Sequence, residues 1–224
     1  MIKKHVPNFI TCLNLFSGCV AALLAFKGNY QGAFIAILVA AVFDFFDGFA
    51  ARLLKAYSPM GKELDSLADM VSFGFAPGMI VFSLLTEANI NEWLPYLAFI
   101  IPVFSGLRLA KFNIDERQTS SFIGMPTPAN AIFWGGSALS YSSLLVQNYW
   151  VVIVLTIIFS YLLVAEMPMF SLKFKSGKWN DNKTQYIFLM QCAIMIIGLK
   201  LGAFPIIIIL YILNSLAYLF IKEK

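Results

Sequence analysis

Four aspartates lie close together in a chain that is otherwise strongly apolar. They are Asp44, Asp47, Asp65 and Asp69, and they fall in the stretch DFFDGFAARLLKAYSPMGKELDSLAD. An ionised carboxylate in a membrane-spanning segment costs at least about 2.5–3.5 kcal/mol. The aspartates therefore need a polar cavity, a partner or a cation that compensates their charge.

The spacing of these aspartates puts each pair on one face of its own helix. The first two are three residues apart and the last two are four residues apart, which corresponds to about 60° and about 40° around a helix axis. Between the pairs, Ser58, Pro59 and Gly61 are turn residues. We therefore expect a helical hairpin that brings the two pairs opposite each other near the inner membrane surface.

Convergent carboxylates indicate a metal site, because Mg²⁺, Mn²⁺ and Ca²⁺ prefer oxygen ligands. The competing interpretation is a solvated cluster in which the aspartates pair with Arg52, Lys55 and Lys62. Gly48 and Ala51 thin the same helix face and can admit a bulky ligand. That feature favours the metal-site interpretation.

Long apolar helices must position these residues. The 224-residue chain is 60% hydrophobic and 12% charged, whereas soluble domains are about 45–50% apolar and about 25% charged. Runs long enough to cross hydrocarbon, about 20 residues each, occur at approximately 7–26, 31–54, 66–86, 93–112, 125–146, 149–172, 184–200 and 203–221. We predict an all-α, polytopic transmembrane bundle of about eight helices, although the last two runs could form one kinked segment.

The distribution of basic residues predicts the orientation of this bundle. If both termini are cytoplasmic, only Lys27 and Lys200 of the 16 lysines and arginines fall on the outer side. The charge of +4 is thus a topology signal and requires no nucleic-acid partner. We expect an integral protein of a bacterial inner membrane, with its active site near the cytoplasmic face.

We expect a single domain over residues 1–224. Its motif-bearing core covers about 7–172, and additional C-terminal helices cover about 184–221. The first apolar run is interrupted by Asn8, Thr11 and Asn14. We therefore expect it to be a permanent helix and not a cleaved leader.

The aspartate region resembles the signature of the CDP-alcohol phosphotransferase family at every fixed position: Asp44-x-x-Asp47-Gly48-x-x-Ala51-Arg52, eight residues, Gly61-x-x-x-Asp65-x-x-x-Asp69. The resemblance implies a membrane enzyme in which a hydroxyl group displaces CMP from a CDP-linked lipid or alcohol, without a phosphorylated enzyme intermediate. It implies that the four aspartates hold two divalent cations, Mg²⁺ or Mn²⁺. It also implies that Asp69 takes the proton from the attacking hydroxyl.

The resemblance assigns further signature residues to the CDP-linked lipid. They are Gly48, Ala51, Arg52, Ser58 and Gly61. Arginine can hold a phosphate through two parallel hydrogen bonds, which lysine cannot. Glycine at position 48 permits close approach of a nucleotide to the backbone.

A polar stripe runs along the first expected helix, where Asn8, Thr11 and Asn14 follow at three-residue steps. Unsatisfied amides are costly inside a membrane. The stripe could hydrogen-bond to neighbouring helices. As in the family, it could instead bind the cytidine or its phosphates, and we predict this second role.

The acceptor is predicted from other segments. GLRLAKFN at 106–113, FIGMPTPAN at 122–130 and DSLADMVSFG at 65–74 are similar to the phosphatidylserine synthase branch of the family. That branch usually reads Arg-Leu-Ala-Arg-Phe-Asn. Lys111 therefore keeps the positive charge of the second arginine but cannot form its two parallel hydrogen bonds. Serine brings a carboxylate that needs a cation, and we predict Arg108 for it, with Lys111 and Asn113 in support. Arg108 could instead be a positive-inside anchor, and Glu166 could pair with a cation or contact the serine ammonium.

The leading hypothesis is an enzyme that transfers the phosphatidyl group of CDP-diacylglycerol to L-serine. The alternatives within the class use glycerol 3-phosphate or an inositol phosphate, whose dianionic phosphate favours a denser set of arginines. An ion transporter is the alternative from another class, but the acidic residues concentrate in one hairpin and no related second half is apparent. The resemblance also implies a homodimer.

Overall fold

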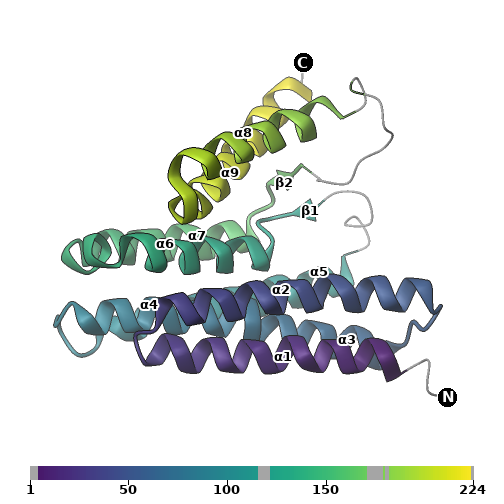
Figure 1. The fold of residues 1–224 in the computed structure, drawn as a ribbon, viewed down its shortest axis with the longest axis horizontal. Helices are drawn as coiled ribbons and strands as arrows, with labels where there is room; N and C mark the ends of the chain where they lie inside the picture. The colour runs from purple at the N-terminus through teal and green to yellow at the C-terminus, as the bar shows by residue number, and fades with distance from the viewer. Residues whose placement is uncertain (1–4, 116–121, 171–178, 180–181, 223–224) are drawn as a thin grey trace.

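The computed structural model describes residues 5–115, 122–170, 179 and 182–222, which form a helical bundle with one short pair of strands (Figure 1). The helices are α1 (His5–Phe26), α2 (Tyr30–Leu53), α3 (Pro59–Asp69), α4 (Ala76–Glu87), α5 (Ile100–Ile114), α6 (Thr127–Gln147), α7 (Tyr149–Val164), α8 (Lys183–Leu199) and α9 (Ala203–Lys222). The strands are β1 (Phe122–Ile123) and β2 (Pro168–Met169). The predicted all-α fold class is confirmed.

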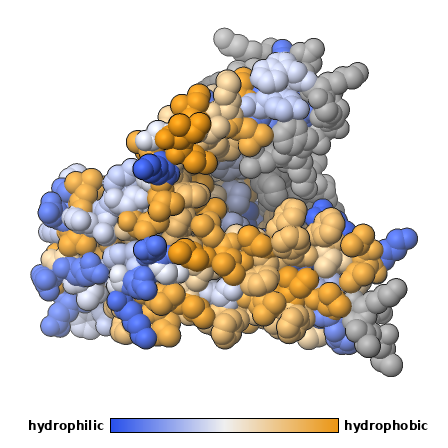
Figure 2. Space-filling model, viewed as in Figure 1, coloured by the Kyte–Doolittle hydropathy of each residue, from blue (hydrophilic) through white to orange (hydrophobic). Residues whose placement is uncertain are grey.

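Five helical segments in the described part of the chain are long and apolar enough to cross a membrane. They are His5–Phe26, Tyr30–Leu53, Pro59–Glu87, Leu94–Ile114 and Lys183–Ala217, the last of which combines α8 with most of α9. Apolar side chains cover much of the flank of the bundle, and polar ones gather at its left end (Figure 2). The chain is therefore an integral membrane protein. Eight crossings and two cytoplasmic termini stay predictions.

Helix α1 packs against both helices that carry the aspartates and against the segment that follows them. It contacts α2, α3, α4 and the turn Met70–Phe75. A Cβ atom at Gly18 would lie 2.7 Å from the Cα atom of Ser72, so glycine is needed for this close approach. In contrast, α2 and α3 make few close backbone contacts with each other. The predicted hairpin is thus splayed, and α1 joins its two arms.

Helix α3 begins earlier than the apolar pattern predicts. The predicted third helix covered 66–86, whereas the helical segment runs from Pro59 to Glu87. Ser58 caps its start, because the Ser58 hydroxyl accepts a hydrogen bond from the Gly61 amide at 3.0 Å. Proline in the first turn suits this position because its missing amide hydrogen would have no helical partner. Asp65 and Asp69 therefore lie inside a helix.

A π-helical turn at Met70–Phe75 follows Asp69 and joins α3 to α4. The turn packs against both α1 and α5. Gly74 allows this packing, because a Cβ atom there would lie 2.9 Å from the Cβ atom of Ser105. Such turns insert an extra residue into a helix and change which residues share a face. Here the turn separates the carboxylate-bearing face of α3 from the apolar packing face of α4.

The sixth predicted run, 149–172, is wrong at its end. Helix α7 ends at Val164, and Pro168 begins the short strand β2. Proline disfavours a helix at the preceding residues. The strand pairs with β1, so that Phe122 lies opposite Met169 and Ile123 opposite Pro168. Glu166 consequently lies in the link between α7 and β2, and not inside a membrane helix as predicted.

The C-terminal helices α8 and α9 form a hairpin (Figure 1). A short 3₁₀ turn at Lys200–Gly202 separates them, so the described structure does not support one kinked segment. Helix α9 packs against α6 and against β2. The Tyr211 hydroxyl donates a hydrogen bond to the Phe170 carbonyl oxygen at 3.2 Å. This bond attaches α9 to the connection that follows α7.

Candidate active site

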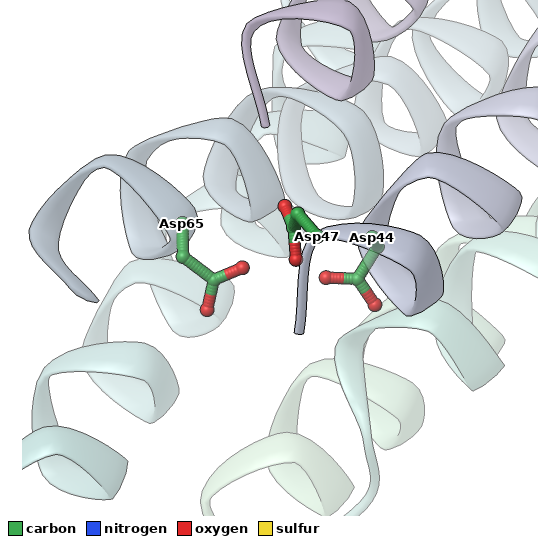
Figure 3. Close-up of side chains that lie close together, drawn as sticks. All are labelled: Asp44, Asp47 and Asp65. Atoms are coloured by element: carbon green, nitrogen blue, oxygen red, sulfur yellow. The ribbon is translucent and has the colours of Figure 1, made fainter. Parts of the chain in front are cut away.

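Three of the four predicted aspartates converge between α2 and α3. Asp44 and Asp47 project from α2 and Asp65 projects from α3, and their carboxylates point toward one another (Figure 3). One oxygen from each carboxylate can be chosen so that all three atoms lie within 4.8 Å of one another. Asp47 is buried, and the other two are half-buried. The predicted meeting of the two helix faces is therefore present in the structure.

Asp69 lies one helical turn beyond Asp65 and extends this group toward α1. Its Oδ1 atom accepts a hydrogen bond from the Asn14 side-chain amide at 3.4 Å. Its carboxylate also lies within hydrogen-bonding reach of the Asp44 carboxylate. Asp69 thus belongs to the same group as the three converging aspartates, but it alone contacts Asn14.

The competing ion-pair interpretation is not what the described residues show. Among them, none of the four aspartates forms a salt bridge with a lysine or an arginine. Arg52 donates through Nε to the Gly48 carbonyl oxygen at 3.1 Å. Lys62 donates through Nζ to the Asn113 carbonyl oxygen at 2.9 Å. The charge of the carboxylates is thus left for another cation to compensate.

The donor set fits a hard divalent cation. Carboxylate oxygens at this mutual separation suit Mg²⁺ or Mn²⁺. In addition, Asp47 Oδ2 is buried and has no hydrogen-bond partner in the described part of the chain. A buried anionic oxygen without a partner is costly. The aspartate group therefore could hold a metal, and its identity and the number of ions stay predictions.

A pocket with a volume of about 540 Å³ opens beside the aspartates. It is lined by six of the eight residues predicted to bind the CDP-linked lipid: Asn8, Thr11, Gly48, Ala51, Ser58 and Gly61. Asp47 and Asp65 also line it, so the pocket and the carboxylates adjoin. The pocket lies in the opening between the splayed helices α2 and α3.

The two glycines of this pocket serve different purposes. A Cβ atom at Gly48 would meet nothing within 4 Å, so protein packing does not demand glycine there. A Cβ atom at Gly61 would lie 3.1 Å from both Asn8 Oδ1 and Ser58 Oγ. Gly61 thus leaves little space for a side chain where α1 packs on the start of α3. Gly48 instead leaves free space on the side of the pocket.

Two of the predicted CDP contacts lie outside the pocket, and five residues that were not predicted as ligand contacts line it, of which two are polar. Arg52 does not line the pocket but lies beside it, since its side chain contacts Gly48. Asn14 also does not line it and contacts Asp69 instead. Tyr57 and Lys62 line the pocket and were missed as ligand contacts. Tyr57 lies in the short α2–α3 connection and Lys62 lies near the start of α3, and this closeness to Ser58 and Gly61 was the available signal.

The three residues predicted to bind serine point to different partners. Arg108 on α5 is 7% exposed, lies within electrostatic range of Asp69, and has its guanidinium 5.8 Å from the Phe112 ring centroid. Lys111 forms a salt bridge of 3.1 Å with Glu166. Of the two roles considered for Glu166, this contact corresponds to pairing with a cation of the protein.

Asn113 is engaged within the protein. Its side-chain amide donates to the Ser66 hydroxyl at 2.9 Å, and its carbonyl oxygen accepts from Lys62. Together with the Lys111 salt bridge, these contacts attach α5 to α3 and to the α7–β2 link. Arg108 lies within electrostatic range of Asp69, whereas Asn113 contacts α3 at Ser66.

Comparison with known proteins gives one family. The sequence profile of the CDP-alcohol phosphatidyltransferase family matches residues 4–165, which include the aspartates and the pocket and end before α8. A Bacillus subtilis protein named CDP-diacylglycerol–serine O-phosphatidyltransferase is 34% identical over 79% of this chain and 99% of that protein. A Methanocaldococcus jannaschii protein of the same name is 29% identical over 96% of this chain and 94% of that protein. A Saccharomyces cerevisiae protein of the same name is 40% identical over 57% of this chain and 51% of that protein.

Proposed function

Because the chain belongs to the CDP-alcohol phosphatidyltransferase family, we propose that it transfers the phosphatidyl group of CDP-diacylglycerol to the hydroxyl of L-serine. The products are phosphatidylserine and CMP. The names of its relatives in bacteria, archaea and yeast support serine as the acceptor. The observation that carries the proposal is the aspartate group, which adjoins an open pocket and has the buried Arg108 within electrostatic range.

In this reaction the serine oxygen attacks the phosphorus that carries the diacylglycerol. A new oxygen–phosphorus bond forms, and the bond from this phosphorus to the bridging oxygen of CMP breaks with its electron pair. The serine hydroxyl proton would pass to the Asp69 carboxylate, which acts as the general base. No group is oxidised or reduced, and no bond to the enzyme forms.

The four aspartates would hold the two divalent cations. When bound, such cations neutralise the charge that develops on the attacked phosphoryl group and on the leaving phosphate. Asp44, Asp47 and Asp65 supply the converging oxygens. We propose Asp69 as the base because the family resemblance assigns it this role, and its contact with Asn14 at the edge of the group toward α1 supports a role different from that of the other three.

The pocket would receive the nucleotide. Asn8, Thr11 and Ser58 offer polar groups for the cytidine or its phosphates, and Gly48 and Ala51 leave room beside the carboxylates. Arg52 would bind a phosphate by exchanging its contact with the Gly48 carbonyl oxygen for a charged acceptor. The acyl chains would remain in the membrane, which the exposed apolar flank of the bundle faces.

On the acceptor side, Arg108 would bind the serine carboxylate. Lys111 and Asn113 would support it through the contacts that fix α5. We also propose a site near the cytoplasmic face of a bacterial inner membrane, on the basis of the charge distribution. A homodimer is proposed from the family resemblance, and light scattering of the protein in detergent would measure its mass.

The test uses the purified full chain with CDP-diacylglycerol, Mn²⁺ or Mg²⁺, and labelled serine. We expect serine-dependent release of CMP and labelled phosphatidylserine, and loss of both in Asp69→Asn. Glu92→Gln is the matched control, because Glu92 is an exposed acid outside the site. CMP release with glycerol 3-phosphate or an inositol phosphate, but not with serine, would overturn the acceptor. Cation flux without CMP release would overturn the enzymatic function.

A further inference from the structure

Asn14 occupies a fixed position between α1 and the segment that follows Asp69. Its side chain is 0% exposed, and its amide nitrogen donates to Asp69 Oδ1 at 3.4 Å. Its backbone carbonyl oxygen accepts a hydrogen bond from the Ser72 hydroxyl at 3.0 Å. The close approach of Gly18 to Ser72 holds the two helices together at this level. The amide therefore has little freedom to move away from Asp69.

The contact with Asp69 determines which way the amide faces. A carboxylate accepts hydrogen bonds, so the nitrogen of Asn14 must face it and the oxygen must face elsewhere. That oxygen, Oδ1, is buried and has no hydrogen-bond partner among the described residues. Buried acceptors are nearly always satisfied, and an exception in a native structure calls for an explanation. A donor that arrives with a substrate is such an explanation.

A complementary group lies on another helix near Asp69. Arg108 is 7% exposed, lies within electrostatic range of Asp69, and its Nε atom has no hydrogen-bond partner in the part of the chain that the structure covers. Helix α1, which carries Asn14, and helix α5, which carries Arg108, both pack against the π-helical turn directly after Asp69. Asp69 is thus associated with one unpartnered acceptor and one unpartnered donor.

An amino acid with a hydroxyl side chain matches these three groups. Its hydroxyl needs a base, its carboxylate needs a donor cation and its ammonium needs an acceptor. Asp69 and Arg108 already meet the first two needs under the proposed function. We propose that Asn14 is a specificity-determining residue whose Oδ1 accepts a hydrogen bond from the ammonium of the acceptor. This inference rests on the proposed function and replaces the predicted contact of Asn14 with the CDP-linked lipid.

The test compares three acceptors on the full chain in detergent–lipid micelles. L-Serine carries both charged groups, 3-hydroxypropionate lacks the ammonium, and ethanolamine lacks the carboxylate. In Asn14→Leu we expect the preference in kcat/KM for serine over 3-hydroxypropionate to fall about 10- to 100-fold, the effect of losing a hydrogen bond to a charged group. The KM for CDP-diacylglycerol should stay unchanged. In Arg108→Met the preference for serine over ethanolamine should fall instead.

Controls separate this role from the others. Asn91→Leu makes the same exchange at an exposed position and should leave every ratio unchanged. Asn14→Gln keeps the amide and should retain part of the preference, which keeps the test valid if the leucine variant does not fold. An equal loss with all three acceptors would assign Asn14 to positioning Asp69 only. A higher KM for CDP-diacylglycerol would restore the nucleotide role, and weaker activation by Mn²⁺ would indicate a cation ligand. Each of these results would overturn the inference.

The inference and the proposed function fail in different ways. If the wild-type protein makes no phosphatidylserine, the proposed function fails. If the wild-type protein makes phosphatidylserine and Asn14→Leu still discriminates between serine and 3-hydroxypropionate as strongly, only the role of Asn14 fails.

Discussion

The surroundings of the aspartate group differ between the open pocket and the Asn14–Arg108 region. The pocket has a volume of about 540 Å³ and is lined mainly by small and polar residues of α1, α2 and α3. The Asn14–Arg108 region is closed, and each of its two polar side chains is buried with an unpartnered atom. A large ligand that enters with its lipid tail needs a preformed opening. A small zwitterion needs charged groups in a desolvated place, where they discriminate strongly.

The two regions also draw on different lengths of the chain. The pocket is formed within residues 7–65, inside one continuous motif region. The closed region combines Asn14 on α1, Asp69 on α3 and Arg108 on α5, and Tyr211 on α9 lies within electrostatic range of Arg108. Residue 211 lies beyond the family match, which ends at residue 165. Helix α9 therefore lies close to the closed region although it is outside the part of the chain that matches the family.

The largest effect is expected where the two regions meet. Asp44→Asn removes one charge from the converging carboxylates, so a divalent cation should bind more weakly and both substrates should lose their common centre. We expect activity to fall about 1,000-fold or more, because a catalytic metal contributes several kcal/mol to the transition state. Steady-state CMP release would measure this loss, and a chelator should reproduce it in the wild-type protein. Retained activity after chelation would refute the metal assignment.

A smaller effect, confined to the pocket, is expected from Gly48→Val. The new side chain would enter free space, so thermal stability should stay the same while the nucleotide loses room. We expect the KM for CDP-diacylglycerol to rise about 10-fold and the KM for serine to stay unchanged. Gly61→Ala is the informative contrast, because its Cβ atom would press on Asn8 and Ser58 and should lower the melting temperature. Equal effects of the two variants on stability would remove the distinction between them.

The sequence predicted the pocket better than the closed region, for a physical reason. Helical spacing and a short connection are local, so they placed Asp44, Asp47 and Asp65 correctly opposite one another. Apolar runs do not reveal caps and breaks. The predicted runs therefore missed that α3 begins at Pro59, after its cap Ser58, and that α7 ends before Pro168.

The partners of Asn14 and Arg108 depend on tertiary packing, which spacing does not encode. The hydrogen bond from Asn14 to Asp69 depends on the close approach of Gly18 to the π-helical turn. The position of Tyr211 near Arg108 depends on how α9 packs against β2. No motif in the sequence joins segments that lie this far apart.

The smallest effect is expected from Tyr211→Phe, which tests whether α9 influences the closed region. The variant removes the hydroxyl that donates to the Phe170 carbonyl oxygen and that lies within electrostatic range of Arg108. One neutral hydrogen bond contributes about 1 kcal/mol, so the KM for serine should rise about 3- to 5-fold while the KM for CDP-diacylglycerol stays constant. Tyr161→Phe is the matched control, because Tyr161 is 64% exposed on α7. If both variants behave like the wild type, α9 only packs against the core, and the closed region does not extend beyond α5.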